Sequence, residues 1–296
     1  MARFLFWSDL HCEFSPFEIP KPVGDEGALP GAPSRDEVDG ILIGGDSGPG
    51  SHNIEILLHA WNVWRVPVVS VPGNHEAWGA TSFQRYIKYE RELLDKAQKS
   101  GFDIDVLRCG VREVSGTRII GATLWTDMQL RGPAGEIAAG TSQGMGDYSQ
   151  ILWEDPSGVR PLQVADTIKM HWQEFDFILG ELDRAWSGQT LVLTHHSPLA
   201  EAMAPQFKNR PHPLDAAYFS DHWRRIGDKR FDAWLFGHAH GAQEVVMQGA
   251  FGELPFLTNM RGYPSEALPF DPYRIIDSAA PLPAYCDEPV DRYSPA

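Results

Sequence analysis

The sequence predicts an α/β fold, and three observations support this prediction. Short aliphatic or aromatic runs, typical of strands buried on both faces, recur along the chain. Longer segments between several of these runs have apolar residues at helical spacing. Midway along the chain, apolar residues alternate around Ser115-Gly116, which indicates a β-hairpin.

The expected elements follow one another in chain order. The strand-like runs are residues 4–7, 41–43, 68–71, 191–194 and 234–236, the hairpin covers residues 111–122, and closing strands are expected at 243–247 and 255–258. Helices are expected at residues 53–65, 82–100 and 162–185. Gly101 lies just past the second of these, where a glycine often ends a helix.

Each of the five strand-like runs is followed by side chains of the kind that bind metal ions. Asp9 and His11 follow the first run, and Asp46 follows the second after two glycines that permit a sharp turn. The later runs are followed by Asn74, His195, His238 and His240. These side chains offer the oxygen and nitrogen donors that divalent cations accept. Because open α/β sheets place their chemistry at the carboxyl ends of strands, we expect the donors to converge.

In chain order, these blocks read Asp-x-His, Gly-Asp, Gly-Asn-His-Glu, His and Gly-His-x-His, and they resemble the calcineurin-like metallophosphoesterase superfamily over roughly residues 3–262. The resemblance implies a four-layer αββα sandwich of two mixed sheets flanked by helices. It also implies two divalent metal ions (Mn, Fe, Zn or Ni) and a hydroxide between them that attacks phosphorus. By motif position, Asp46 would bridge both ions. The other ligands would be Asp9, His11 and His240 on one ion and Asn74, His195 and His238 on the other.

His75 and Asp46 are the expected catalytic residues. By the same resemblance, His75 would protonate the leaving oxygen rather than bind metal. Family members often carry an acid after Gly-Asp that orients this histidine, but here Ser47-Gly48-Pro49 follows Asp46. This departure excludes the pattern of Ser/Thr protein phosphatases, and the lack of a tyrosine two residues after Asp46 excludes that of purple acid phosphatases. Glu76 is one candidate for orienting His75.

The remaining histidines carry no such pattern. His196 follows the expected ligand His195, and it would either support that ligand or contact phosphate. We assign the ligand role to His195 because it directly follows the apolar run. Ordinary core or surface roles are expected for His52, His59, His171, His212 and His222.

Residues 127–160 are rich in Gly, Pro, Ser and Asp and show no period. A segment of this length without regular structure is either functional or disordered. Two interpretations stay open: a mobile surface insertion, or a substrate lid from which Tyr148 or Asp147 touches the substrate. Residues 198–215 form another loop punctuated by prolines. From residue 264, proline recurs with acidic residues, which predicts one catalytic domain (1–263) and a C-terminal tail (264–296).

The charge pattern bears on the substrate. The formal net charge is −15 without a run rich in Lys and Arg, which disfavours nucleic acid. No arginine stands near the donors in the loops after Asp46, Asn74 and His195, so a small phosphodiester suits the site better than a monoester dianion. Arg261 is the best remaining phosphate contact, unless it is an ordinary surface arginine. The alternative functions are a phosphomonoesterase or nuclease of this fold, and a non-catalytic metal-binding scaffold for a protein partner.

The sequence carries few signals of cellular location. The apolar run near the N-terminus is too short for a signal peptide, and no run is long enough to span a membrane. The three cysteines, Cys12, Cys109 and Cys286, imply no disulfide framework. A cytoplasmic location is therefore expected, and the sequence carries no indication of the oligomeric state.

Overall fold

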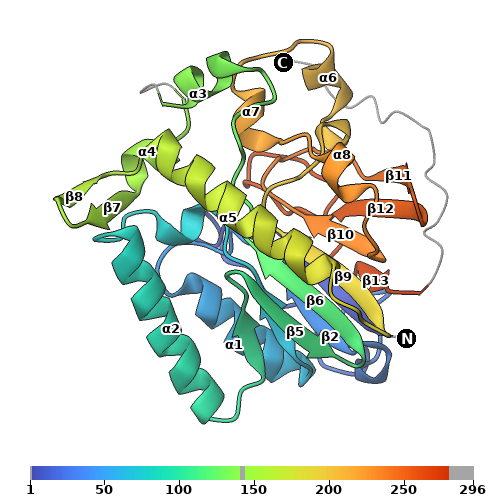
Figure 1. The fold of residues 1–296 in the computed structure, drawn as a ribbon. Coiled ribbons are helices and arrows are strands. Elements are labelled where there is room, and N and C mark those ends of the chain that lie inside the picture. The colour runs from blue at the N-terminus through green and yellow to red at the C-terminus, as the bar shows by residue number, and fades with distance from the viewer. Residues whose placement is uncertain (1, 141–143, 280–296) are drawn as a thin grey trace.

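Two mixed β-sheets packed face to face form the centre of the protein (Figure 1). The computed structural model describes residues 2–140 and 144–279. The first sheet has the strand order β13-β1-β2-β3-β4, and the second has the order β11-β12-β10-β9-β6-β5. Helices cover the outer face of each sheet, so the predicted αββα sandwich is confirmed.

The strands run mainly parallel. In the first sheet these are β1 (Arg3–Trp7), β2 (Gly40–Ile43), β3 (Val68–Ser70) and β4 (Ile104–Val106), with β13 (Ile275–Asp277) antiparallel to β1. The second sheet has parallel β6 (Thr117–Ala122), β9 (Gln189–Thr194), β10 (Ala233–Phe236) and β12 (Gly252–Thr258), flanked by antiparallel β5 (Gly110–Val114) and β11 (Val245–Gly249). All the predicted strands, including the hairpin, are therefore confirmed.

Alternation along each strand divides the core into layers. Phe4 and Phe6 of β1 lie in the cluster between the two sheets. Leu5 and Trp7 point to the opposite face, where they pack with α1 (His52–Trp64), and α2 (Phe83–Lys99) covers the same face. Because both faces of β1 are buried, its sequence is a continuous apolar run rather than an alternating one.

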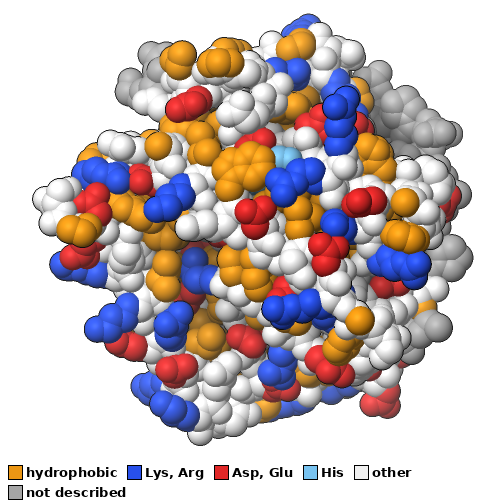
Figure 2. All heavy atoms as spheres, viewed as in Figure 1, with side chains coloured by type: hydrophobic (Ala, Val, Ile, Leu, Met, Phe, Trp, Pro, Cys, Tyr) orange, Lys and Arg blue, Asp and Glu red, His pale blue; other side chains and the backbone are white. Residues whose placement is uncertain are grey.

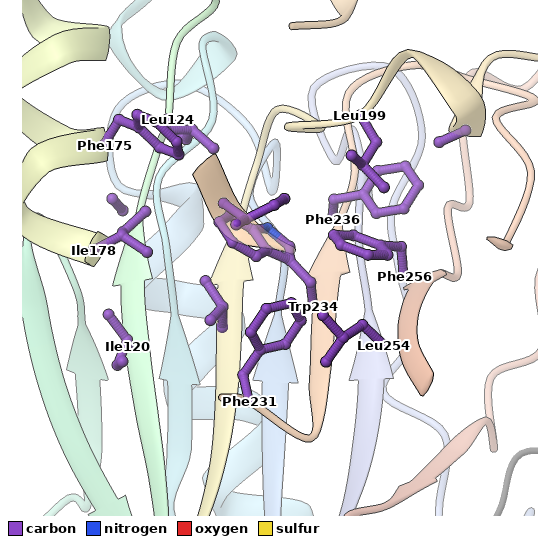
Figure 3. Close-up of a cluster of buried hydrophobic side chains, with 14 of the residues drawn as sticks. Ile120, Leu124, Phe175, Ile178, Leu199, Phe231, Trp234, Phe236, Leu254 and Phe256 are labelled. Carbon is purple, nitrogen blue, oxygen red and sulfur yellow. The ribbon is translucent and has the colours of Figure 1, made fainter. Parts of the chain in front are cut away.

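The outer face of the second sheet is covered by α5 (Val164–Leu182), which crosses this sheet in Figure 1. Phe175 and Ile178 of α5 pack in one cluster with Ile120, Trp234 and Phe256 of the strands (Figure 3). These side chains are fully buried, so this helix is fixed against the sheet by its apolar face. The three predicted helices are confirmed to within a few residues.

The insertion at residues 127–160 contains more regular structure than its sequence predicts. It includes α3 (Pro133–Ala139), α4 (Asp147–Gln150) and a hairpin of β7 (Leu152–Asp155) with β8 (Gly158–Pro161). The prediction of a segment without regular structure is therefore wrong. Such short elements carry no period of their own and depend on contacts elsewhere, such as the stacking of Trp153 on Phe83.

The 198–215 loop likewise contains short helices. α6 (Pro205–Lys208) lies within it, α7 (Asp215–Tyr218) begins at its end, and α8 (Trp223–Ile226) follows. α3, α6 and α7 lie near the carboxyl ends of the strands in the second sheet, whereas Ile226 of α8 packs in the cluster on its outer face (Figure 1).

Residues 264–279 belong to the domain, so the predicted boundary at residue 263 is wrong. β13 pairs with β1, with Ile276 opposite Phe4. The Trp7 indole donates a hydrogen bond to the Pro272 carbonyl at 2.9 Å. Backbone pairing of this kind needs no apolar period, which is why the sequence did not show it. The rest of the predicted tail, residues 280–296, lies outside the described residues.

The surface carries both signs of charge. On the face drawn in Figure 2, basic and acidic side chains are interspersed without a continuous basic area. Within residues 2–140 and 144–279, no helix combines the length and the apolar character that crossing a lipid bilayer requires.

Candidate metal centre

The predicted metal ligands follow the carboxyl ends of strands in both sheets. Asp9, Asp46 and Asn74 come after β1, β2 and β3, which are parallel neighbours. His195 and His238 come after β9 and β10, which are also parallel neighbours. The two sheets end at the same place, and a hydrogen bond of 2.9 Å from the His238 amide to Asp9 Oδ1 joins them there.

The backbone at this edge is held in a conformation that most residues avoid. Asp9, His11, Asp46 and His238 have φ values of 53°, 45°, 53° and 65°, in the left-handed region. Residues in this region persist where the surroundings over-determine them, as at binding sites. Gly73 allows a close approach of the chain, because a Cβ atom at this position would clash with the Asp46 carboxylate.

Three side chains form a first group of donors. His240 Nε2 lies 3.3 Å from Asp9 Oδ1 and 3.2 Å from His11 Nε2. All three ligand atoms lie within 4.8 Å of one another. The structure therefore brings together the three residues that the resemblance assigns to one ion.

A second group of donors surrounds the Asn74 side-chain oxygen. This oxygen lies 3.0 Å from His195 Nε2 and 3.1 Å from His238 Nδ1. Asp46 lies between the groups, with Oδ1 3.4 Å from His195 Nε2 and Oδ2 3.8 Å from His11 Nε2. One oxygen of Asp46 thus faces each group, as a bridging carboxylate requires.

Hydrogen bonds on the far side of the histidines show that these groups fit divalent cations. His195 Nδ1 donates to the Gly44 carbonyl at 2.8 Å, and His240 Nδ1 lies 2.6 Å from Glu266 Oε2. Each bond directs the lone pair of the other ring nitrogen toward the donor group, as in metal-ligating histidines. Burial favours the protonated form of Asp46, but the charges of His195 and His75 keep its pKa well below the usual value, so the carboxylate is ionised.

His75 lies beside both groups and is held from three sides. Its Nδ1 lies 2.7 Å from Glu13 Oε1, and its Nε2 lies 3.3 Å from the Tyr263 hydroxyl. Its ring stacks on Trp78 with centroids 3.7 Å apart. Burial acts to lower the pKa of His75, but the charge of Asp46 and the bond to Glu13 raise it to about 9. The imidazole is therefore protonated near neutral pH and fixed in orientation.

Glu13 orients His75, and the sequence did not indicate this role. The carboxylate of Glu76, the residue considered for it, instead accepts hydrogen bonds of 2.7 Å from the Ser47 and Gly73 amides. Glu76 therefore fixes the backbone that carries Asp46, and its candidacy is wrong. The only signal for Glu13 is an acid two residues after His11, which has no meaning without the loop conformation.

Of the two insertion residues expected to touch the substrate, Asp147 points to the metal centre and Tyr148 points away from it. Asp147 Oδ1 accepts hydrogen bonds from the Asn74 amide at 2.7 Å and from the Trp78 indole at 2.9 Å, so it supports a donor of the centre. The Tyr148 hydroxyl lies 3.0 Å from Thr167 Oγ1 on α5. Of the two predicted substrate contacts, only Asp147 lies at the centre; Tyr148 turns toward α5.

His196 and Arg261 contact residues that support the site rather than the cavity beside it. His196 is buried, and its ring lies 3.9 Å from that of His238, which places it behind a ligand. The Arg261 guanidinium donates to the Leu10 and Ser15 carbonyl oxygens at 2.6 and 3.0 Å and so holds the loop after β1. Its Nη2 bonds Ser15 and Pro16 of the same loop, and Arg261 is not among the residues lining the cavity beside the donors, so the structure does not support the expected contact with phosphate.

A cavity of about 500 Å³ opens beside the donors. Its polar lining includes Asp46, Asn74, His75, His238 and His240. Its other walls come from the insertion, from the segment around α6 and α7, and from residues 263–266. The apolar part of this lining includes Trp78, Met145, Phe207, Leu214, Tyr218 and Tyr263. The arrangement can hold a small molecule with a polar group at the donors and an organic group against the aromatic walls.

Comparisons with known proteins agree with this geometry. The sequence profile of the calcineurin-like phosphoesterases matches residues 2–242. An uncharacterized protein of Acanthamoeba polyphaga mimivirus is 26% identical over 211 residues, which cover 70% of this chain and 72% of that protein. Among solved structures, the phosphopantetheinyl hydrolase from Mycobacterium tuberculosis is similar, with a TM-score of 0.54 and 16% identity over 89% of this chain and 90% of that one. At this identity the likeness concerns the fold alone.

Proposed function

Since this chain belongs to the calcineurin-like phosphoesterase family and is a metal-dependent hydrolase of phosphoester bonds, we propose that its substrate is a small phosphodiester. One observation carries the proposal: among the described residues, no Lys or Arg lines the cavity beside Asp46 and His238. A monoester dianion concentrates more charge than a diester monoanion and is commonly held by guanidinium groups. The guanidinium of Arg261, the one candidate clamp, is bound to the loop after β1.

Two divalent ions fit the two donor groups that share Asp46. Mn, Fe, Zn and Ni all accept such mixed oxygen and imidazole donors. When bound, such ions neutralise phosphate charge and activate water as the nucleophile. The role of the protein is to hold the carboxylates ionised and to orient the imidazoles: the bonds of His195 and His240 to Gly44 and Glu266 leave the other ring nitrogen of each facing the donors, where a bound ion would take the place of its proton.

His75 is the proton donor to the leaving oxygen in this proposal. Its Nδ1 proton is bound to Glu13, and its Nε2 lies 3.9 Å from Asp46 Oδ2, on the side of the donors. Stacking on Trp78 and the Tyr263 hydroxyl prevents rotation of the ring. A protonated imidazole held in a fixed orientation beside the donors is what general acid catalysis needs.

The insertion contributes to substrate choice in this proposal, as one wall of the cavity. Met145 and Asp147 line the cavity from this segment, opposite Tyr218 and Tyr263. Aromatic walls favour a diester in which at least one ester group is apolar or aromatic. The likeness to a phosphopantetheinyl hydrolase is one of fold and does not assign that substrate to this chain.

The test compares kcat/KM for bis(p-nitrophenyl) phosphate and p-nitrophenyl phosphate at one pH and with one metal, starting with Mn²⁺. We expect the diester to be the better substrate. A preference of tenfold or more for the monoester would overturn the proposal. The control is Asp46→Asn, which lacks the shared carboxylate and should hydrolyse neither ester.

The same assay separates the alternatives. Turnover of either ester excludes a purely non-catalytic scaffold, and hydrolysis of single-stranded or duplex DNA would favour a nuclease.

We also propose a cytoplasmic location, which the free thiols of Cys12 and Cys109 in the described chain support.

A further inference from the structure

A second group of metal-binding side chains lies away from the centre, between α5, α8 and the loop after β6. It consists of Asp127, His171 and His222, with one donor atom from each residue, all within 4.8 Å of one another. α5 and α8, which carry the two histidines, lie side by side (Figure 1). All three side chains are buried, with exposures of 5%, 0% and 5%. The sequence predicts ordinary roles for both histidines, because they belong to no motif.

The ring nitrogens of the two histidines converge. His171 Nε2 lies 2.8 Å from His222 Nε2, which lies 3.7 Å from Asp127 Oδ2. His171 Nδ1 is bonded to the Trp125 carbonyl oxygen. A carbonyl oxygen only accepts, so Nδ1 carries the proton, and the lone pair on Nε2 points at the other two donors. This second bond to a backbone carbonyl is the arrangement that orients metal-ligating histidines.

The carboxylate of this group is buried and forms no ion pair with a Lys or Arg in the described part of the chain. Asp127 Oδ1 accepts a hydrogen bond of 2.9 Å from the Gln129 amide. Arg225 of α8 pairs instead with Asp176 and lies over the Phe175 ring.

Buried carboxylates in proteins are generally paired with a cationic group or coordinate a metal ion. A divalent cation among the three donors would supply the missing partner of Asp127. Phe175 encloses the site, with its ring 4.3 Å from that of His222.

We propose that Asp127, His171 and His222 bind a divalent metal ion of the Zn²⁺ class. Two imidazoles and one carboxylate are the donors that Zn²⁺ accepts, and a water completes four-coordination. Imidazole nitrogens on a tetrahedral Zn²⁺ lie roughly 3.4 Å apart. The two rings must therefore separate slightly on binding.

The ion would connect α5 to the loop that supports the metal centre. Asp127 belongs to the same loop as Thr123, whose carbonyl accepts hydrogen bonds from the His195 and His196 amides at 3.2 and 3.1 Å. The proposed ion therefore has a structural role, fixing the loop on which a ligand of the centre rests. The inference is independent of the substrate class proposed above.

The first test counts ions with Zn²⁺ as the probe. Wild-type protein, His171→Gln, His222→Gln and the control His59→Gln, whose side chain is exposed on α1, are stripped with a chelator, reloaded and freed of excess metal. Mass spectrometry is expected to find one Zn²⁺ per chain fewer in the first two variants than in wild type and the control. Equal contents in all four proteins would overturn the proposal.

The second test needs no variant and so does not depend on a variant folding. Crystals of the Zn²⁺-loaded wild-type protein are measured at the zinc absorption edge. An anomalous peak is expected between His171 Nε2, His222 Nε2 and Asp127 Oδ2. A fully occupied metal centre without a peak at these three atoms would show that the two histidines only share a hydrogen bond.

Discussion

The metal centre and the group of Asp127, His171 and His222 (the Asp127 group) both offer carboxylate and imidazole donors, but different kinds of secondary structure carry them. The donors of the centre project from loops after strands, where Asp9, Asp46 and His238 occupy left-handed backbone conformations. In the Asp127 group, His171 projects from the middle of α5 and His222 from the start of α8. The donors at the strand ends therefore form recurring short motifs in the sequence, whereas His171 and His222 stand singly on different elements and form none.

The two sites also differ in the direction in which the pKa values of their histidines shift. At the centre, burial acts to lower the pKa of His195, but Asp46 and Asp9 outweigh it and raise the pKa to about 10. In the Asp127 group, burial prevails and the pKa of His222 falls to about 3. The difference follows from the number of carboxylates: several face the histidines of the centre, and one faces the pair. The centre is therefore built for more positive charge than the Asp127 group.

The substitution Asp46→Asn should affect the metal centre most strongly while leaving the Asp127 group intact. This change should lower activity by more than about 10⁴-fold, above the range for a single proton-transfer group, because one carboxylate serves both donor groups. Metal analysis should show loss from the centre and retention of the ion at the Asp127 group. Two ions still bound at the centre with wild-type affinity would contradict the bridging role.

The next largest effect is expected for His75→Ala. For diesters with poor leaving groups, kcat should fall by about 10²–10⁴-fold, since the leaving oxygen loses its proton donor. A nitrophenolate leaving group needs no proton and should be affected far less. Steady-state kinetics on both kinds of diester check this, and equal losses would assign His75 a purely positional role.

A smaller loss is expected for Glu13→Gln. The amide keeps the size of the side chain but removes the charge that holds His75, so kcat should fall by about 10–100-fold, as for partners of other site residues. Glu18→Gln, an exposed neighbour in the same segment, is the matched control and should behave as wild type.

Glu13 acts through His75 only if the two losses do not add. The double variant His75→Ala with Glu13→Gln should be no slower than His75→Ala alone. An additive loss would mean that Glu13 acts mainly through its second contact, 3.3 Å from His11 Nδ1.

The smallest effect is expected for Asp147→Asn. The amide oxygen can still accept from Asn74 and Trp78, so kcat/KM should stay within about tenfold of wild type. Asp147→Ala removes the acceptor and should weaken metal binding at the Asn74 side of the centre, as metal titration would reveal. Unchanged metal affinity in Asp147→Ala would show that Asn74 needs no such support.

The α/β fold class and the convergence of the donors could be predicted because both rest on local patterns, and the resemblance to a family added the two-sheet sandwich. Parallel strands bring Asp9, Asp46 and Asn74 to one edge wherever the runs before them are strands. The role of Glu13 could not be predicted because its approach to His75 depends on the path of the loop after β1, which Arg261 holds from far along the chain. The strand β13 could not be predicted because backbone pairing, not a side-chain pattern, joins it to β1.

The meeting of both sheets at the centre has a consequence for biosynthesis. Asp9 leaves the ribosome early, but His240, which completes the same donor group, follows only after most of the chain. At about 5–20 residues per second, roughly ten to fifty seconds separate the two. β1 must wait longer still for β13, its second neighbour in the sheet. The nascent chain therefore has no finished site to capture an ion until the strands of both sheets have been made and have met.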